Sequence, residues 1–261
     1  MQPPQLEQVA VDFKAHVATV TLNRPEQRNP LSATMLRDLA SALQWCKAET
    51  DVRAVVLTGA GRVFCAGADL SSFDGETSVD KFRSRDLFVD LFILMSELGK
   101  PIVGRINGHA LAGGFGLACS CDILVAVDTA SFGLPEINVG IWPMMIQAIL
   151  SRSIPRKVLL EMEMLGDRWS AGQLQSLGIV NRVVPHEQLD STVDEIAQKL
   201  AKKSPIAMRL GRDSFYRQQD MDFRAAMHYL HGQFLLVSAT EDSREGMKAF
   251  FEKREPDFKG R

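Results

Sequence analysis

Residues 106–126 read INGHALAGGFGLACSCDILVA, a stretch in which Gly113, Gly114 and Gly116 stand between two apolar runs. A glycine-rich turn that leads into a helix can bind a phosphate, stabilise an oxyanion through backbone N–H groups, or allow two elements to pack closely. Residues 122–127 have the apolar character of a strand that is buried on both faces. The chain on either side of the turn narrows the choice among the three roles.

Up to about residue 185 the sequence alternates short strands with helices. β-branched runs on both sides of Lys14-Ala15-His16 predict a hairpin, and Ser32 is placed to cap a helix. The predicted elements are a hairpin in 8–23, helices in 32–48 and 82–98, and buried strands in 54–58, 102–106 and 122–127. Their order, strand, helix, strand, helix, strand, indicates an α/β core.

After Pro185 the pattern becomes nearly continuous amphipathic helix, with breaks near Ser204-Pro205 and at residues 220–222. We expect residues 1–195 to form the core and residues 196–261 to form a C-terminal helical region. Such a region packs either on its own core or on a neighbouring subunit.

The composition is that of an ordinary globular protein: of 261 residues, 46% are hydrophobic and 24% are charged, and the net charge is -2. The 32 acidic residues outnumber the 30 basic ones, so nothing favours nucleic-acid binding. Because no secretory signal and no bilayer-spanning apolar run is visible, we expect no membrane insertion. Cys46, Cys65, Cys119 and Cys121 are interpreted as buried small residues in a reducing, cytoplasmic compartment, and no metal site is expected.

Two turns of small residues follow predicted strands, and neither matches a nucleotide-binding motif. Gly59 and Gly61 begin a G-x-G-x-x-G pattern, but Phe64 stands where the third glycine is required. Neither turn ends in the Gly-Lys-Ser/Thr of a phosphate-binding loop. The N–H groups of residues 66–68 and 112–114 could instead converge on one carbonyl oxygen as an oxyanion hole. Turns that serve only close packing are the alternative.

A third segment, SFGLPEINVGIWP at residues 131–143, contains a single carboxylate, Glu136, among apolar residues. Desolvation by Leu134, Pro135 and Ile137 is expected to raise the pKa of this glutamate from about 4.3 toward neutrality, as a proton-transferring base requires. A water-exposed glutamate without a catalytic role is the alternative.

These segments, in this order, resemble the crotonase superfamily, which comprises the enoyl-CoA hydratases and isomerases. The matching stretches are TLNRPEQRNPLS (21–32), FCAGADL (64–70), INGHALAGGFGLACSCDILVA (106–126), FGLPEINVGI (132–141) and GMKAFFEKREPDFKGR (246–261). The resemblance implies an α/β fold, a spiral of ββα units with a C-terminal helical oligomerisation region, and assembly as a homotrimer or a dimer of trimers. It also implies an acyl-CoA thioester substrate and no cofactor apart from the coenzyme A that the substrate carries.

Carried over by position, the resemblance implies that the N–H groups of Ala68 and Gly113 hold the thioester oxygen and that Glu136 is the acid/base. The residues that would line the path of coenzyme A or of the acyl chain are Gln27, Arg28, Ala66, Asp69, Leu70, Gly116, Trp142, Phe250 and Lys253. In relatives, the tail positions that match Phe250 and Lys253 often act from the adjacent subunit. Solvated surface charges are the alternative for Arg28 and Lys253.

The chain departs from the hydratases of that superfamily at two places. Hydratases carry a second glutamate three residues after the oxyanion glycine, where this chain has Gly116, and a PGxGG segment where it has Pro143, Met144 and Met145. Hydration divides its work between two carboxylates, whereas moving a proton between Cα and Cγ takes one base. The resemblance therefore favours Δ3 to Δ2 isomerisation slightly over hydration, with Trp142 and the two methionines in a dry acyl pocket.

Other functions stay open at the level of sequence. They are hydration with a single catalytic glutamate, acyl-CoA binding with weakened catalysis, and related chemistry such as decarboxylation or thioester hydrolysis. The length of the acyl chain is not indicated by any motif.

Overall fold

The computed structural model describes residues 2–69 and 78–261, without the side chains of residues 78–85. Its larger sheet has the strand order β1-β2-β3-β5-β7-β10. The strands are β1 Val9–Lys14, β2 Val17–Leu22, β3 Ala54–Gly59, β5 Ile102–Ile106, β7 Ile123–Val127 and β10 Arg182–Val184. β1 and β2 form the predicted antiparallel hairpin, in which Ala15 and His16 have the positive φ angles, 48° and 66°, of a two-residue turn. The other strands of this sheet pair in parallel.

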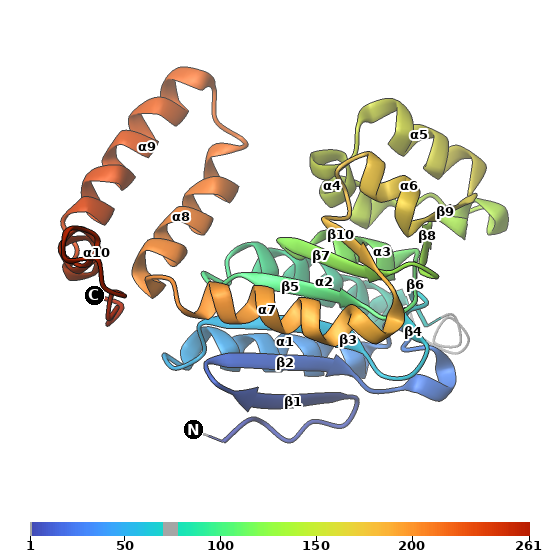
Figure 1. Ribbon diagram of the computed structural model, residues 1–261. Helices are drawn as coiled ribbons and strands as arrows, with labels where there is room; N and C mark the ends of the chain where they lie inside the picture. The colour runs from blue at the N-terminus through green and yellow to red at the C-terminus, as the bar shows by residue number, and fades with distance from the viewer. Residues whose placement is uncertain (1, 70–77) are drawn as a thin grey trace.

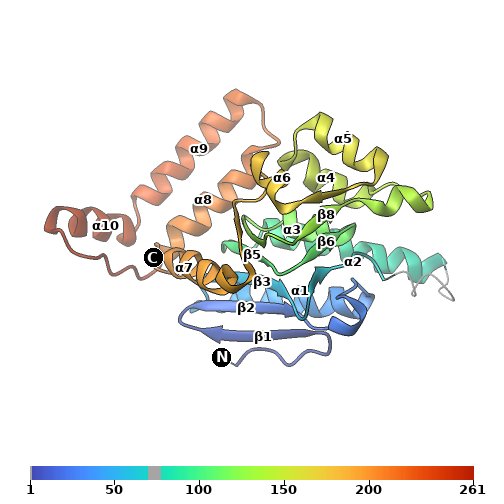
Figure 2. The ribbon, with the colours of Figure 1, turned by 45° about the vertical axis from the view of Figure 1, so that its right-hand side comes forward.

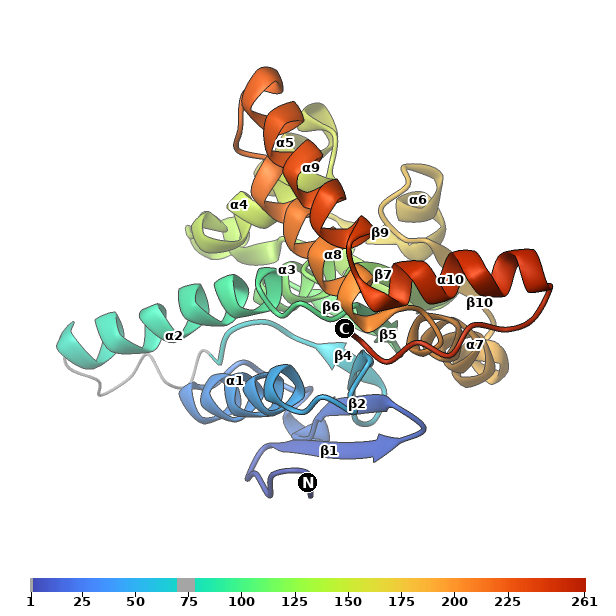
Figure 3. The ribbon, with the colours of Figure 1, turned by 90° about the vertical axis from the view of Figure 1, so that its left-hand side faces the viewer.

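Helices cover both faces of the larger sheet. α1 (Ala33–Ala48) and α2 (Ser78–Ser96) lie on one side, and α7 (Leu189–Ala201) lies on the other (Figure 3). The side chain of Ser32 accepts a hydrogen bond from the N–H of Met35 and so caps α1, as predicted. Because both faces are covered, every residue of β3 is buried, which explains its largely apolar sequence.

A second, smaller sheet has the strand order β4-β6-β8-β9, with β4 Val63–Cys65, β6 His109–Leu111, β8 Ser131–Gly133 and β9 Arg168–Ser170. β4, β6 and β8 run parallel, and β9 is antiparallel to β8. Each of β3, β5 and β7 leads along the chain directly into β4, β6 or β8, so the chain moves three times from one sheet to the other. A helical segment follows each pair, namely α2, then α3 (Gly113–Cys119), then η3 (Pro135–Val139) with α4 (Met144–Ser153). This repetition is the expected spiral of ββα units.

The remaining short helices frame the smaller sheet and the turns between elements. They are η1 Pro25–Gln27, α5 Arg156–Leu165, α6 Ala171–Ser176 and η4 His186–Gln188. α4, α5 and α6 gather above β8 and β9 in Figure 1. α5 packs against both α4 and η3.

The last three helices, α8 (Pro205–Gln218), α9 (Phe223–Ser238) and α10 (Glu241–Glu252), extend away from the sheets (Figures 1 and 2). The domain boundary expected at residue 195 falls inside α7, a continuous helix whose Val193, Ile196 and Ala197 are buried. α7 packs on the larger sheet, so the projecting region begins only at Pro205. An amphipathic pattern predicts a helix, but it does not predict the surface on which the apolar face of that helix packs.

α8 is joined to the core through the buried side chain of Arg212. Nε of Arg212 donates to Oδ2 of Asp122 at 2.8 Å, and its other two guanidinium nitrogens donate to the carbonyl oxygens of Ser96 and Met95. The hydroxyl of Tyr216 donates to the second carboxylate oxygen of Asp122 at 2.9 Å. One arginine therefore links α8 to the end of α2 and to the start of β7.

The cysteine thiols behave as small buried groups. Cys46, Cys65 and Cys121 are buried and Cys119 is partly buried. Burial raises the pKa of the thiols of Cys46 and Cys65 to about 12, so both are protonated at neutral pH. Within residues 2–69 and 78–261, no helix combines the length and the apolar character needed to cross a membrane.

Candidate active site

Three loops meet at one edge of the smaller sheet. Because β4, β6 and β8 are parallel neighbours, the residues that follow their C-terminal ends lie side by side, as ligand-binding loops do in other parallel sheets. These residues are 66–69, 112–116 and 134–140, the three segments singled out by sequence. The strand register places Leu111 opposite Gly133, which fixes the second and third loops next to each other.

The loops that contain Ala68 and Gly113 are in van der Waals contact. Gly67 has a φ angle of 100°, and a Cβ added there would lie 2.7 Å from Cβ of Ala112 and 3.4 Å from the nitrogen of Gly113. Both the conformation and the space therefore require glycine at position 67. Among the described residues, neither the N–H of Ala68 nor that of Gly113 donates to another backbone group, so both can bind a ligand oxygen.

Ala112, the residue immediately before Gly113, has a strained backbone. Its φ and ψ angles are 52° and -129°, a conformation that residues with a Cβ rarely adopt. Strain of this kind costs about 1–3 kcal/mol and is retained where the surrounding structure enforces it, most often at functional sites. At Ala112 it sets the direction of the N–H of Gly113, the first residue of α3.

Glu136 lies in the first turn of η3, directly after β8. Its side chain is half-buried, and Oε2 is buried without a hydrogen-bond partner in the described part of the chain. Burial raises the pKa of the carboxyl, its own backbone N–H lowers it, and the negative charge of Glu163 raises it further. The direction of this shift agrees with the one expected from the apolar neighbours of Glu136, and a carboxylate with a raised pKa is a stronger base than an ordinary glutamate.

The space beside Gly116 is filled by Ile146. A Cβ added to Gly116 would lie 2.3 Å from Cγ2 and 2.7 Å from Cβ of Ile146, and 3.6 Å from the ring of Phe92. Ile146 is buried in the first turn of α4. Gly116 is itself buried. An apolar side chain thus occupies the place at which the sequence lacks a second carboxylate.

The loop with Gln27 and Arg28 lies beside the loop with Ala66 and Asp69. The N–H of Ala66 donates to the carbonyl oxygen of Arg28 at 3.0 Å. Nη1 of Arg24 pairs with Oδ2 of Asp69 at 3.1 Å. The side chains of Gln27 and Arg28 are exposed, where a ligand can reach them from solvent.

Asn29 ties the loop that carries Gln27 and Arg28 to the turn between β3 and β4, and the sequence did not single it out. It is fully buried with a φ angle of 53°, and its Nδ2 donates to the carbonyl oxygens of Ala60 and Val63 at 2.9 and 2.8 Å. Its Oδ1 accepts a hydrogen bond from the N–H of Arg24. The available signal was an Asn-Pro pair in a loop, because asparagine tolerates the left-handed conformation better than most residues.

Two predicted ligand contacts, Phe250 and Lys253, are not brought to this site by the same chain, and a third lies outside the described residues. Leu70 lies outside the described residues. Phe250 in α10 is 79% exposed, and Lys253 follows the end of that helix with a φ angle of 54°. α10 lies on the opposite side of the molecule from β4, β6 and β8 (Figures 1 and 2). Within one chain these two residues are therefore remote from the candidate site.

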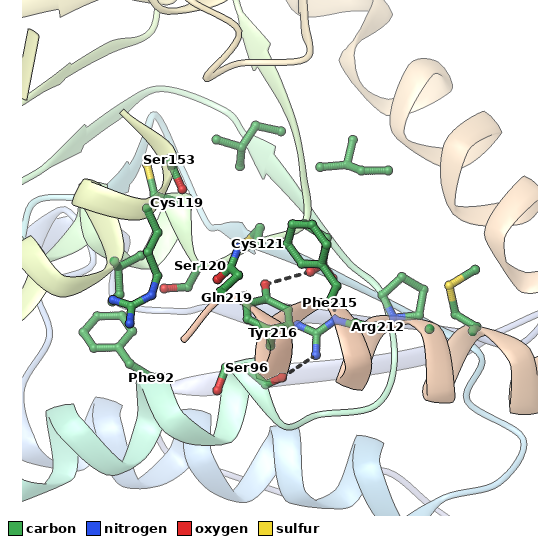
Figure 4. A pocket seen from close by; sticks show the side chains of 18 of the residues that line it. Phe92, Ser96, Cys119, Ser120, Cys121, Ser153, Arg212, Phe215, Tyr216 and Gln219 are labelled. Carbon is green, nitrogen blue, oxygen red and sulfur yellow. Dashed lines mark hydrogen bonds and ion pairs between the residues drawn. The ribbon is translucent and has the colours of Figure 1, made fainter. Parts of the chain in front are cut away.

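A cavity of about 1240 Å³ lies between α2, α4 and α8 (Figure 4). α2 and α4 contribute mainly apolar side chains, and α8 contributes Arg212, Phe215 and Tyr216. Phe92 lines this cavity and also borders the space beside Gly116, so the cavity and the site share a wall. Trp142, between η3 and α4, is partly buried, and its Nε1 donates to Oε1 of Gln147 at 3.2 Å.

Comparison with known proteins finds similarity over nearly the whole chain. A family model described as enoyl-CoA hydratase/isomerase matches residues 12–261. The 2,3-dehydroadipyl-CoA hydratase of Escherichia coli is 34% identical over 258 residues, which cover 98% of this chain and 100% of that protein. An enoyl-CoA hydratase from Bacillus anthracis has a similar crystal structure, with a TM-score of 0.94 and 34% identity over 98% of this chain and 100% of that one. The rat mitochondrial enoyl-CoA hydratase domain-containing protein 3 is 35% identical over 92% of this chain and 80% of its own length.

Proposed function

The chain belongs to the enoyl-CoA hydratase/isomerase family, and from that premise we propose that it moves the double bond of an enoyl-CoA thioester from Δ3 to Δ2. Glu136 is the acid/base, and the N–H groups of Ala68 and Gly113 bind the thioester oxygen. The coenzyme A of the substrate is the only cofactor-like group that the reaction uses. The observation that carries the proposal is the contact of Ile146 with Gly116, which puts an apolar side chain where a second catalytic carboxylate would project.

The reaction needs one base, which accepts a proton from the substrate and later returns it. Glu136 removes a proton from Cα of the 3-enoyl thioester, and the electron pair of that C–H bond delocalises onto the thioester oxygen. The N–H groups of Ala68 and Gly113 stabilise the resulting dienolate, each contributing about 3–4 kcal/mol. Glu136 then returns the proton to Cγ as the C–O double bond re-forms, which leaves the double bond between Cα and Cβ. The raised pKa of Glu136 suits both half-reactions, because the group must lose and regain a proton within one turnover.

Hydration with Glu136 as the single carboxylate is the second candidate. The observation that favours hydration is the names of the relatives, since the E. coli and B. anthracis proteins are both named as hydratases. Against it stands the apolar side chain of Ile146, which offers no group to orient or activate a water molecule at position 116. A loss of one of two proton-transfer groups typically costs about 10²–10⁴-fold in rate.

Separate assays with a 2-enoyl-CoA and a 3-enoyl-CoA, with identification of the product, distinguish the candidates. An isomerase converts the 3-enoyl ester to the 2-enoyl ester and forms little 3-hydroxyacyl-CoA. A hydratase forms the 3-hydroxy ester from the 2-enoyl substrate. A binding protein with weakened catalysis converts neither ester, yet both esters raise its unfolding temperature.

Glu136→Gln tests the residue itself. The amide keeps the shape of the side chain but cannot accept the proton, so turnover should fall by about 10²–10⁴-fold while binding of the CoA ester survives. Retained turnover in this variant would reject the role of Glu136 in either reaction.

We further propose a homotrimer or a dimer of trimers in the cytoplasm. The assembly is supported by Phe223, Phe234, Phe250 and Phe251 on the projecting helices, which are 67–82% exposed in the single chain. In an assembly of this kind Phe250 and Lys253 would close the coenzyme A site of the adjacent subunit. The free cysteines favour a reducing compartment, whereas the rat relative is named as mitochondrial, so fractionation of cells is the deciding measurement. Sedimentation analysis tests the assembly.

A further inference from the structure

Glu163 is a buried carboxyl group that the proposed reaction does not use. It lies in α5, its side chain is 0% exposed, and neither carboxylate oxygen has a hydrogen-bond partner among the described residues. Buried glutamates are rare, and nearly all of them are paired or hydrogen-bonded, because an isolated charge in an apolar environment is strongly unfavourable. An unpartnered pair of oxygens therefore calls for a physical explanation.

Glu163 lies on α5, the helix that packs against η3, and η3 carries Glu136. The C-terminal end of α5 packs closely on η3, since a Cβ added to Gly166 would lie 2.8 Å from both Ile137 and Asn138. Oε2 of Glu136 is buried without a partner as well, so two carboxyl groups with unsatisfied oxygens are held by two helical segments in contact. The influence of the charge of Glu163 on the pKa of Glu136 follows from this placement.

No cation offsets the two carboxyl groups in the part of the chain that the structure describes. The other charged residues of α5, Arg156, Lys157 and Glu161, are exposed, and η3 carries no charged residue besides Glu136. Arg152, on the neighbouring α4, pairs instead with Asp220. Burial raises the pKa of Glu163.

We propose that Glu163 is a positioning residue that shares one proton with Glu136, and that it thereby sets the pH range in which Glu136 can accept a proton from the substrate. Ionisation of one carboxyl group opposes ionisation of the other where burial weakens solvation, so the pair releases its second proton at a higher pH than its first. The retained proton removes the charge that would otherwise be buried without a partner. The role in catalysis rests on the proposed function of Glu136, whereas the sharing of the proton does not.

Thermal unfolding as a function of pH tests the sharing without any assay of activity. A carboxyl whose pKa is raised in the folded state stabilises the fold below its unfolded pKa and loses that contribution as the pH rises through its folded pKa. Glu163→Gln cannot ionise, so it should unfold about 3 °C above the wild type near pH 8, and the difference should vanish near pH 4. Glu163→Met, which is apolar and of similar length, should show the same pH dependence. Glu161→Gln, an exposed neighbour on the same helix, should show none.

The double variant Glu136→Gln/Glu163→Gln measures the coupling between the two groups. If they share a proton, Glu163→Gln should raise the unfolding temperature at pH 8 by less in the Glu136→Gln background than in the wild type. Strict additivity at every pH, or a Glu163→Gln variant whose unfolding temperature follows that of the wild type across the pH range, would overturn the proposal.

The pH dependence of kcat/KM supplies a readout that a merely structural role would not move. In Glu163→Gln the acid limb of the profile should move to lower pH, because no neighbouring charge opposes the ionisation of Glu136. If Glu163→Gln is active and the acid limb of its kcat/KM profile does not move, Glu163 does not set the pH range of Glu136. The proposed function of Glu136 is unaffected by that result. If neither enoyl ester is converted, the proposed function fails, and the unfolding data still decide whether the proton is shared.

Discussion

The side chain of Ile146 on α4 occupies the space into which any side chain at Gly116 on α3 would project. A Cβ at position 116 would lie 2.3 Å from Cγ2 and 2.7 Å from Cβ of Ile146, and Cβ atoms in proteins do not approach other atoms this closely. Glycine at position 116 is therefore a packing requirement of this chain as well as the absence of a carboxylate. A second glutamate cannot be restored there by one substitution.

Gly116→Glu alone should destabilise the protein and give no gain in hydration. Overpacking of this kind costs about 1–3 kcal/mol. Ile146→Ala does not remove the conflict, because its Cβ would remain 2.7 Å from the new Cβ. Only Gly116→Glu combined with Ile146→Gly opens enough space, and this double variant should hydrate a 2-enoyl-CoA faster than the wild type. Unfolding temperatures and hydration rates of both single variants and the double variant check this, and a stable Gly116→Glu single variant would contradict it.

The loops of this site could be predicted from sequence because their signals are local. Small residues after apolar strands predicted the turns at Ala68 and Gly113, and apolar neighbours predicted the raised pKa of Glu136. Ile146 lies 30 positions after Gly116, and it reaches the glycine only through the packing of α4 on α3, which no local pattern encodes. Glu163 was missed for the same reason, since its burial depends on how α5 packs against η3.

The activity should depend on pH through a pKa above 4.5, the ordinary value for glutamate. Below the raised pKa, Glu136 is protonated and cannot accept the Cα proton, so kcat/KM should rise as the pH increases through that pKa. Measurement of kcat/KM across the pH range gives this limb directly. A limb at or below pH 4.5 would show that the carboxyl is solvated when the substrate binds.

Glu136→Gln should stabilise the fold at neutral pH while it removes activity. The ionised carboxyl is partly desolvated and its Oε2 has no partner among the described residues, so the stability present below the unfolded pKa is lost as the pH rises through the folded pKa. The unfolding temperature of the variant should therefore exceed that of the wild type near pH 8 and match it near pH 4. Equal temperatures at both pH values would mean that burial does not affect Glu136.

Ala68→Pro should reduce kcat by about 10²–10³-fold without unfolding the protein. Proline removes the N–H that is proposed to bind the thioester oxygen. The neighbouring hydrogen bonds, from the N–H of Leu31 to the carbonyl oxygen of Gly67 and from the N–H of Asp69 to that of Leu31, do not involve the Ala68 nitrogen. Ala68→Ser keeps the N–H and should remain active. A fully active Ala68→Pro enzyme would exclude this N–H from the oxyanion hole.

Arg212→Met should weaken the attachment of α8 to the core much more than Arg217→Met. The guanidinium of Arg212 is buried and donates to Asp122, Ser96 and Met95, whereas Arg217 is exposed on the same helix. Removing the guanidinium should cost about 1–3 kcal/mol, because the carbonyl oxygens of Ser96 and Met95 lose a charged donor. Replacing both charges, as Arg212→Met/Asp122→Asn, should cost less than the sum of the single changes. Urea unfolding of the four variants measures these differences. If Arg212→Met loses no more stability than Arg217→Met, then packing contacts other than this ion pair hold the C-terminal helices on the core.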